Sequence, residues 1–344
     1  MFNFAGKRIL VTGACGTVGS ELIRQMLVDS PDAPELVIGV DNNESELFFL
    51  QERFRGNHRV KLFLGDIRDQ TDLHKRLRGI NVVFHAAALK HVILCEGAPD
   101  QAILTNIVGV QNVIAASIAA GCERVVLTSS DKAVNPTSVM GTSKLIGEKL
   151  ITAAAVEHRG GNTVFVSTRF GNVLGSNGSV VEVFRRQIAA GGPITITDAR
   201  MTRFVMGVDD AVRLVIDTAS LAIGGEVFIT KMPVIRIPDL ASAMIAETFV
   251  NRPSSARIEV VTIGVKPGEK LYEELMNSEE TRRAIELDQY FVIPPPLVES
   301  QLFDREAAYG PTLSSGVSKP YVSSDEPCLS VNQIRELLRA KRLI

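Results

Sequence analysis

The chain has 344 residues, 37 of them Lys or Arg and 39 Asp or Glu, which gives a net charge of −2. Its length suits about two domains with sizeable cores, and 45% hydrophobic residues are typical of a globular protein. This balance of charge argues against nucleic acid or an anionic membrane as the main partner.

The four cysteines are far apart, and none forms a CxxC pair: Cys15, Cys95, Cys122 and Cys328. Their spacing predicts no metal site and no disulfide framework, and it fits a reducing cytoplasm. The first residues lack a signal peptide. No uninterrupted apolar run approaches the roughly 18–20 residues that span a bilayer. We therefore expect a cytoplasmic protein with no membrane insertion.

Short β-branched runs alternate with helical periods over the first 170 residues. The predicted strands are residues 8–12, 36–40, 60–64, 82–85, 124–129 and 163–168. Apolar side chains at helical spacing predict helices around Leu22–Leu27, at 103–120 and at 143–156. Nearly all-apolar strands alternating with helices indicate an α/β fold, a doubly wound parallel sheet of the Rossmann type. Its strands would end at one edge, where ligands bind.

The pattern changes after Phe170. A Gly/Asn/Ser loop is followed by predicted helices at 179–190, 209–221, 240–249 and 331–343, with strands in ITITD, EVFIT and IEVVTIG and an extended arm at 311–328. We expect residues 1–170 and about 205–232 to form the nucleotide-binding domain. A smaller, interleaved substrate domain would comprise 171–204 and 233–344.

A glycine-rich loop follows the first predicted strand and opens the first helix, with the sequence TGACGTVG at 12–19. Gly13 allows a tight turn, Gly16 lets the backbone approach a pyrophosphate, and Gly19 lets helix and strand pack closely. The anion would lie on free N–H groups at the helix N-terminus. Such glycines can serve a turn alone, but the ordered strand, turn, helix and second strand favour a dinucleotide site.

Two acidic residues follow the next strands. Asp41 ends the second strand, where a carboxylate accepts both adenosine-ribose hydroxyls and repels a 2′-phosphate. No Lys or Arg lies nearby in the sequence, which favours NAD over NADP. Asp66, after the third strand, could bond the adenine amino group or cap the helix that follows.

Seven motifs in chain order resemble one family. They are TGACGTVGSEL, GDIRD, HAAALKHV, TSSDKAVNPTSVMGTSK, RFGNVLGSNGSV, MTRF and KPGEKLYEEL. Together they resemble the extended short-chain dehydrogenase/reductase superfamily, and within it the UDP-N-acetylglucosamine 4,6-dehydratases of bacterial polysaccharide, glycoprotein and flagellar-glycan biosynthesis. The resemblance covers about residues 5–285. Many relatives carry an N-terminal transmembrane region, and this chain resembles the short soluble members.

The resemblance implies an NAD(P)-dependent, redox-neutral lyase reaction on UDP-GlcNAc, with NADP the less expected cofactor because of Asp41. The sugar C4 hydroxyl is oxidised, which acidifies the C5 proton. That proton is removed, water leaves from C6, and the hydride returns to C6. The product is a UDP-4-keto-6-deoxy-HexNAc.

The resemblance also implies catalytic roles. Ser130 bonds the reacting sugar oxygen, Asp131 protonates the leaving C6 hydroxyl, and Lys132 removes the C5 proton. Lys144 holds the nicotinamide ribose and supplies a positive field. Met140 stands where the superfamily has the tyrosine that accepts the alcohol proton, which a thioether cannot do. Asp131 is the best substitute acceptor, and water relayed by Lys144 is second.

The remaining site residues are implied by motif. The cofactor set comprises Gly13, Gly16, Thr17, Val18, Gly19, Asp41, Asp66, Ile67, Ala86, Ala87, Ala88, Lys90, Asn106 and Lys144. The UDP-sugar set comprises Lys90, Asn172, Ser179, Arg203, Lys266 and Glu269. Lys266 replaces a more usual Arg, which leaves a point charge in place of a bidentate fork.

Two other functions compete with the dehydratase. A UDP-HexNAc 4-epimerase or another extended reductase would need no C5 base and no C6 acid, so the Asp131–Lys132 pair argues against it. The missing tyrosine allows a catalytically silent NAD-binding protein. The family also implies a homo-oligomer, whose interface helices would be 100–120 and 141–155.

Overall fold

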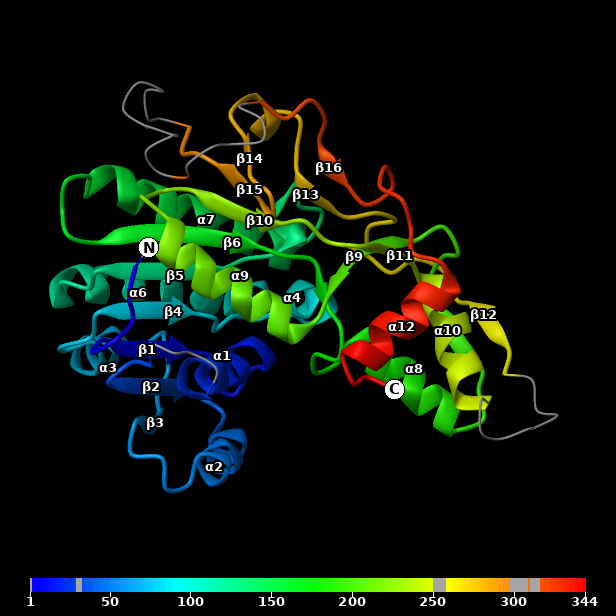
Figure 1. The fold of residues 1–344 in the computed structure, drawn as a ribbon, viewed down its shortest axis with the longest axis horizontal. Coiled ribbons are helices and arrows are strands. Elements are labelled where there is room, and N and C mark those ends of the chain that lie inside the picture. The colour runs from blue at the N-terminus through cyan, green and yellow to red at the C-terminus, as the bar shows by residue number, and fades with distance from the viewer. Residues whose placement is uncertain (1, 29–32, 250–257, 297–308, 310–315) are drawn as a thin grey trace.

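The computed structural model describes residues 2–28, 33–249, 258–296, 309 and 316–344. A large sheet carries the nucleotide-binding half, and a smaller group of helices and short strands lies beyond the ends of its strands (Figure 1). Positions 311–315 of the predicted arm lie outside the described residues.

The large sheet has nine strands among the described residues, in the order β14-β15-β10-β6-β5-β4-β1-β2-β3. Their bounds are Arg8–Thr12 (β1), Leu36–Asp41 (β2), Val60–Leu64 (β3), Val82–His85 (β4), Arg124–Thr128 (β5), Val164–Arg169 (β6), Val227–Thr230 (β10), Ile285–Glu286 (β14) and Tyr290–Ile293 (β15). The seven strands from β3 to β10 are parallel. The strands β15 and β14 add an antiparallel edge. The predicted Rossmann-type sheet is thus confirmed, and the antiparallel edge is an addition to it.

Helices cover both faces of this sheet. Helices α1 (Thr17–Val28) and α9 (Val208–Leu221) pack on one face, and α3 (Gln70–Arg76), α6 (Gly109–Ala120) and α7 (Val139–Glu157) on the other (Figure 1). Side chains alternate along each strand, so Ile9 and Val11 join the core under α1 while Leu10 joins the core under α6. The sheet is therefore packed between two buried hydrophobic cores, which fix the positions of its strand ends.

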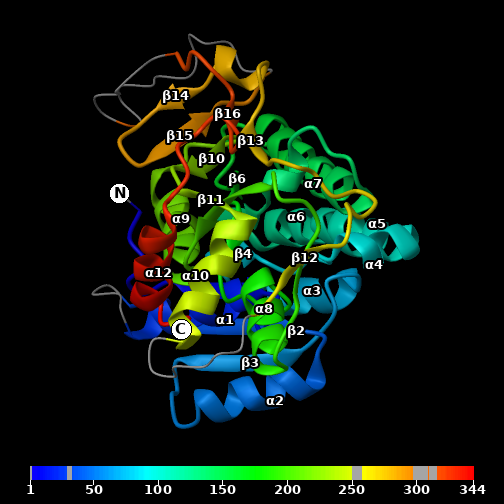
Figure 2. The ribbon, with the colours of Figure 1, turned by 90° about the vertical axis from the view of Figure 1, so that its right-hand side faces the viewer.

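The smaller part has its own core. Helices α8 (Val180–Ala189), α10 (Ile237–Phe249) and α12 (Val331–Ala340) pack together, as Figure 2 shows face on. Short strands accompany them: β7 (Asn172–Val173), β9 (Thr202–Met206) and β11 (Val234–Arg236) in one sheet, β8 (Ile194–Ile196) with β12 (Val260–Thr262), and β13 (Glu274–Met276) with β16 (Tyr321–Val322). This part carries loops to the carboxyl ends of the large sheet's strands.

Three expectations about element boundaries need correction. The strands β14 and β15 extend the large sheet, although residues 233–344 were assigned entirely to the substrate domain. The strand β9, which includes 205–206, belongs to a sheet of the smaller part. The helix expected at 143–156 begins at Val139 because Ser138 caps it, accepting a hydrogen bond from the Gly141 N–H. Chain connectivity alone did not reveal which strands pair.

Several helices were missed from the sequence. Short helices α2 (Glu44–Arg53) and α3 begin at side-chain caps, Asn43 and Asp69 respectively. The long helix expected at 103–120 is preceded by α4 (Val92–Gly97) and α5 (Pro99–Ile103), and it starts with a π-helical turn, Leu104–Val108. The short helices were not predicted because each has too few apolar residues on one face to give a clear helical period.

The helical run Pro99–Ala120 is, among the described residues, the one long and apolar enough to cross a bilayer by length and composition. It contains polar residues such as Asn106, so it is not an uninterrupted apolar run. It packs against α3 and α7, and the core helix of a soluble protein passes the same test. The absence of membrane insertion stays a prediction.

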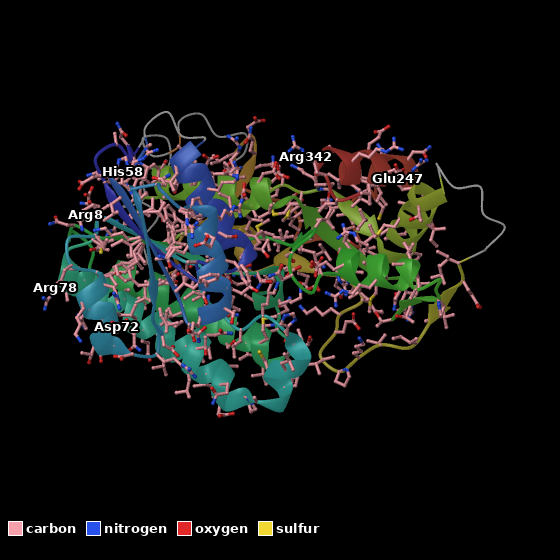
Figure 3. The ribbon with its side chains drawn as sticks, turned by 90° about the horizontal axis from the view of Figure 1, so that it is seen from below. Arg8, His58, Asp72, Arg78, Glu247 and Arg342 are labelled. Carbon is pink, nitrogen blue, oxygen red and sulfur yellow. The ribbon has the colours of Figure 1, made fainter. Side chains whose placement is uncertain are left out.

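Charged side chains lie on the outside of both parts. Figure 3 labels Arg8, Arg78 and Asp72 on the nucleotide-binding part, and Glu247 and Arg342 on the smaller part. The Glu247 carboxylate accepts hydrogen bonds from Arg335 and Arg339, which fastens α12 to α10. Both signs of charge are mixed on this surface, as expected for a net charge of −2.

Candidate active site

The glycine-rich loop adopts the geometry that a phosphate-binding turn needs. Gly13 has φ +68°, and a Cβ on it would lie 2.6 Å from the Ala87 nitrogen. A Cβ on Gly19 would lie 2.1 Å from the Gly13 carbonyl oxygen. Neither position admits a side chain, because the Ala86–Ala87 backbone lies against Gly13 and the first turn of α1 packs on the Gly13 carbonyl. The start of α1, at Thr17 and Val18, is therefore presented at the end of β1 as an anion-binding terminus.

Asp41 and Asp66 lie at the ends of β2 and β3. The Asp41 carboxylate accepts hydrogen bonds from the Cys15 and Asn43 N–H groups, at 2.9 and 3.0 Å. It thus fixes the glycine loop and retains lone pairs for ribose hydroxyls. Asp66 pairs with Arg68, whose guanidinium lowers the pKa of that carboxyl. The alternative that Asp66 caps the next helix is wrong, because Asp69 caps it.

The segment after β4 carries Ala86, Ala87, Ala88 and Lys90. Buried Asn106 holds this segment by accepting from the Leu89 N–H and donating to the Leu89 carbonyl, at 2.8 and 3.0 Å. Lys90 Nζ donates to the Asn177 carbonyl at 2.8 Å, and the Asn177 N–H donates to Thr17 Oγ1. Ile67 is buried beneath. The loop around Asn177 therefore bridges the start of α1 and the end of β4.

A cavity of about 430 Å³ lies between the end of the large sheet and the smaller part. Five predicted site residues line it: Lys132, Asn172, Arg203, Lys266 and Glu269. The other lining residues include His91, Val92, Ile93, Leu94, Thr137, Ser138, Lys270 and Glu273. Residues more than 130 positions apart in the sequence thus meet at one opening.

The Ser130–Asp131–Lys132 sequence forms a hydrogen-bonded cluster beside this cavity. Ser130 Oγ donates to Asp131 Oδ1 at 2.6 Å, and Lys132 Nζ donates to the same oxygen at 2.9 Å. Asp131 is fully buried, and its Oδ2 has no partner among the described residues. An acid and an amine in contact are thus placed where a ligand in the cavity can reach Lys132.

Lys132 has a second carboxylate beside it. Its Nζ lies 3.4 Å from Glu273 Oε1, which in turn lies 3.6 Å from Arg203 Nε. Burial disfavours the ammonium, but the carboxylates of Asp131 and Glu273 outweigh burial and raise the pKa of Lys132. Burial raises the pKa of Glu273. Glu273 and Lys270 were not among the predicted site residues, although both lie inside the KPGEKLYEEL motif.

Lys144 and Met140 lie one turn apart on α7. Lys144 Nζ donates to the Thr128 carbonyl at 2.7 Å, and burial lowers the pKa of Lys144 to about 8. Met140 is buried with Cys95 and Ala102. It packs α7 against α4 and α5, and it is not among the residues lining the cavity.

His85 ends β4 near Lys144. Its Nδ1 lies 2.6 Å from Thr12 Oγ1, and burial lowers the pKa of His85 to about 3. The imidazole is therefore neutral, and its Nδ1 joins β4 to β1, while its Nε2 has no hydrogen-bond partner among the described residues.

The predicted UDP-sugar residues differ in burial and in the hydrogen bonds that they already make within the protein. Arg203 is buried, and it donates to the carbonyls of Thr202, Lys270 and Leu271. Its guanidinium therefore holds the 269–273 segment as well as facing the cavity. Lys266 is exposed. Ser179 does not line the cavity, and its buried Oγ makes no hydrogen bond among the described residues.

The Glu269 carboxylate accepts hydrogen bonds from Thr197 Oγ1 and the Lys266 N–H. These bonds brace the loop that carries Lys266 at the mouth of the cavity. The arrangement offers a dinucleotide cradle on one side, a cationic opening on the other, and an acid–amine cluster between them. Such a site can position a phosphorylated ligand and move protons at its centre.

Comparisons with known proteins agree with this geometry. Residues 9–295 match the model of a family described as polysaccharide biosynthesis protein. An uncharacterized membrane protein of Methanocaldococcus jannaschii is 39% identical over 98% of this chain and 96% of its own length. A UDP-N-acetylglucosamine 4,6-dehydratase (inverting) of Campylobacter jejuni is 36% identical over 90% and 87%. A UDP-glucose 4-epimerase of Rickettsia rickettsii is 35% identical over 97% and 96%.

Solved structures give the same fold. The X-ray structure of Pen from Bacillus thuringiensis is 39% identical, with a TM-score of 0.91 and full coverage of both chains. A UDP-glucuronic acid 4-epimerase of Bacillus cereus, solved with UDP-glucuronic acid and NAD, is 25% identical, with a TM-score of 0.68 over 77% of this chain and 88% of its own. These relatives include both dehydratases and epimerases.

Proposed function

The chain belongs to the polysaccharide biosynthesis protein family of the extended short-chain dehydrogenase/reductase superfamily, and we propose that it is a UDP-N-acetylglucosamine 4,6-dehydratase. Its membership places it among nucleotide-sugar dehydratases and epimerases. The substrate, the cytoplasmic location and the homo-oligomeric state are part of the proposal.

The cofactor is NAD, and the residues around the glycine loop fit it. Gly13 and Gly19 leave a cradle that a Cβ would fill, and Asp41 places a carboxylate where a 2′-phosphate would be repelled. Ala86, Ala87, Ala88, Lys90 and Asn106 would line the cofactor's path, with Lys144 at the nicotinamide ribose. When bound there, NAD would supply the reversible hydride acceptor that the redox-neutral reaction at C4 and C6 requires.

The acid–amine cluster would perform the proton transfers. Asp131 accepts the C4 hydroxyl proton through Ser130, to which it is hydrogen bonded. Lys132 as a neutral amine removes the C5 proton. Asp131 then gives its proton to the C6 hydroxyl, which leaves as water. Each proton taken is returned, so the cycle is balanced.

The cationic wall of the cavity supports a diphosphate-bearing sugar. Lys266 and Arg203 line the opening together with Asn172 and Glu269. Positively charged side chains around a cavity attract the negatively charged phosphates and orient them. The single observation that carries the proposal is Lys132, which contacts Asp131 on one side and opens to this cavity on the other.

A 4-epimerase is the second function considered, because relatives named UDP-glucose 4-epimerase match the chain over almost its full length. An epimerase oxidises and reduces C4 and leaves C5 and C6 untouched. The missing tyrosine at Met140 also keeps a silent NAD-binding protein as an alternative.

NMR of the purified protein with UDP-GlcNAc and NAD in D2O separates these functions. The dehydratase gives a 4-keto-6-deoxy product that carries a solvent deuteron at C5. An epimerase gives UDP-GalNAc with C5 still protonated. Protein that binds NAD and UDP-GlcNAc but turns over neither would identify the silent binder.

A further inference from the structure

Glu273 is a buried carboxylate at the centre of the cavity wall. It is 2% exposed, and its Oε2 has no hydrogen-bond partner among the described residues. Its backbone is fixed, because its N–H donates to Ser323 Oγ and its carbonyl accepts from the Ser323 N–H, both at 2.9 Å. A buried carboxylate oxygen without a hydrogen-bond partner lowers the stability of the fold. Such an oxygen in a rigid segment therefore calls for an explanation, and a role in the reaction is one.

The proposed reaction needs Lys132 as a free amine, yet the resting site keeps it charged. Asp131 and Glu273 flank its Nζ at 2.9 and 3.4 Å, and both stabilise the ammonium. Asp131 cannot take this proton, because it is assigned to carry the proton from the C4 hydroxyl. Some other group must accept the Lys132 proton before the C5 proton can be removed.

We propose that Glu273 is the positioning residue that takes the extra proton of Lys132 when the substrate fills the cavity, and so converts Lys132 into the C5 base. This inference rests on the proposed dehydratase function. The N–H bond at Lys132 Nζ breaks and an O–H bond forms at Glu273, so an ammonium and a carboxylate become an amine and a carboxylic acid. The amine then binds the C5 proton, and after its hydrogens exchange with solvent it returns a proton to C5. On product release, the acid gives its proton back to Lys132.

The charges around Glu273 decide when this transfer occurs. Lys132, Arg203 and Lys270 favour its carboxylate form, while Asp131 and burial favour the acid, and burial raises the pKa of Glu273. The Lys132 side chain is 28% exposed at the cavity, so solvent stabilises the Lys132 ammonium and Glu273 carboxylate while the cavity is free of substrate. A sugar that displaces this water removes that stabilisation, and a neutral pair becomes less costly.

The test is the pH profile of kcat for Glu273→Gln. In the wild type, the transferred proton stays inside the pair, so kcat should be flat between about pH 6 and 8. In the variant, solvent must remove the proton from Lys132. We expect kcat to fall by at least about 100-fold at pH 6 and to rise about tenfold per pH unit, while the KM for UDP-GlcNAc changes little. Solvent deuterium at C5 should follow the same profile.

Two further variants complete the experiment. Glu274→Gln makes the same chemical change one residue along, at a side chain that bonds exposed Asn135, and should keep the wild-type profile. Glu273→Asp keeps a carboxylate, so it should be slower but flat with pH, and it covers the case in which the glutamine variant does not fold.

Three results would overturn the inference. One is a Glu273→Gln profile parallel to the wild type. Another is a Glu273→Asp profile that rises tenfold per pH unit. Wild-type protein that forms no 4-keto product would overturn the proposed function itself, and the inference with it.

Discussion

Two clusters of opposite charge join the large sheet to the segment 269–280, and they are built differently. In the first, Arg169 donates five hydrogen bonds to Glu148 and Glu280 and one to the Leu275 carbonyl, and all three charged side chains are buried. In the second, Lys132 and Arg203 face Asp131 and Glu273 at 2.9 to 3.6 Å. One oxygen on each of these two carboxylates has no partner among the described residues.

The difference separates a structural network from a reactive one. Among the described residues, every side-chain polar atom of Arg169, Glu148 and Glu280 has a hydrogen-bond partner. The cluster therefore fixes the end of β6 against the 275–280 segment and leaves no polar atom of these three side chains unpaired for a ligand. The cluster around Lys132 opens to a cavity, and its missing bonds are those that a ligand could make. Both clusters have similar residues, and only their completeness distinguishes them.

The largest expected effect is on activity, from the open cluster. Lys132→Ala should abolish deuterium exchange at C5, and Asp131→Asn should stop loss of the C6 hydroxyl, each by about 10²–10⁴-fold. Asp131→Asn keeps the shape of the side chain and should unfold near the wild-type temperature, while Lys132→Ala leaves the buried Asp131 carboxylate without its cation and should be less stable. Lys149→Ala, at an exposed lysine, is the control. Product formation near the wild-type rate in both variants would contradict the dehydratase assignment and favour the epimerase.

The closed cluster should show the reverse result. Arg169→Met leaves two buried carboxylates without a cation, and we expect it to lower the free energy of unfolding by about 3–5 kcal/mol. Urea unfolding measures this loss. Adding Glu148→Gln and Glu280→Gln removes the stranded charges and should recover part of it. A loss below about 1 kcal/mol would mean that the network is not structural.

Lys144 and Met140 sharpen the comparison on one helix. Lys144→Ala should lose about 10²-fold in kcat, while Met140→Leu should stay within about threefold, because it replaces one apolar side chain by another of similar volume. With the pKa of Lys144 lowered to about 8, its charge is lost above that pH, so wild-type kcat should fall there. Equal losses in the two variants would show that Met140 has a role beyond packing.

Among the variants expected to lose activity, Arg203→Ala should have the smallest effect. Losing a cation at the diphosphate should raise the KM for UDP-GlcNAc about tenfold or more, with NAD affinity unchanged. Arg200→Ala is the matched control, because Arg200 pairs with Asp198 on the surface. An unchanged KM with a lowered melting temperature would assign Arg203 to holding the 269–273 segment alone.

Local sequence accounted for the features that neighbouring residues build together. The glycine loop was predictable because its turn, strand and helix are contiguous, and its close contacts bear that reading out at Gly13 and Gly19. Asp131 and Lys132 are adjacent, so their contact was implied by their order. The catalytic roles, those of Asp131 and Lys132 included, came by family resemblance and stay predictions.

What the tertiary structure decided lies far apart in the chain. The strand β15 pairs with β10, about 60 residues earlier in the chain, and so adds an antiparallel edge to the sheet. The residues of a single strand do not show which distant strand it will pair with. Glu273 meets Lys132 only because β13 and β16 bring the 269–276 segment over the strand ends. The sequence therefore determined the cofactor loop and the acid–amine pair through short-range geometry. The folded chain alone decided which distant charges surround that pair, because a side chain's charge state depends on burial and on neighbours in space.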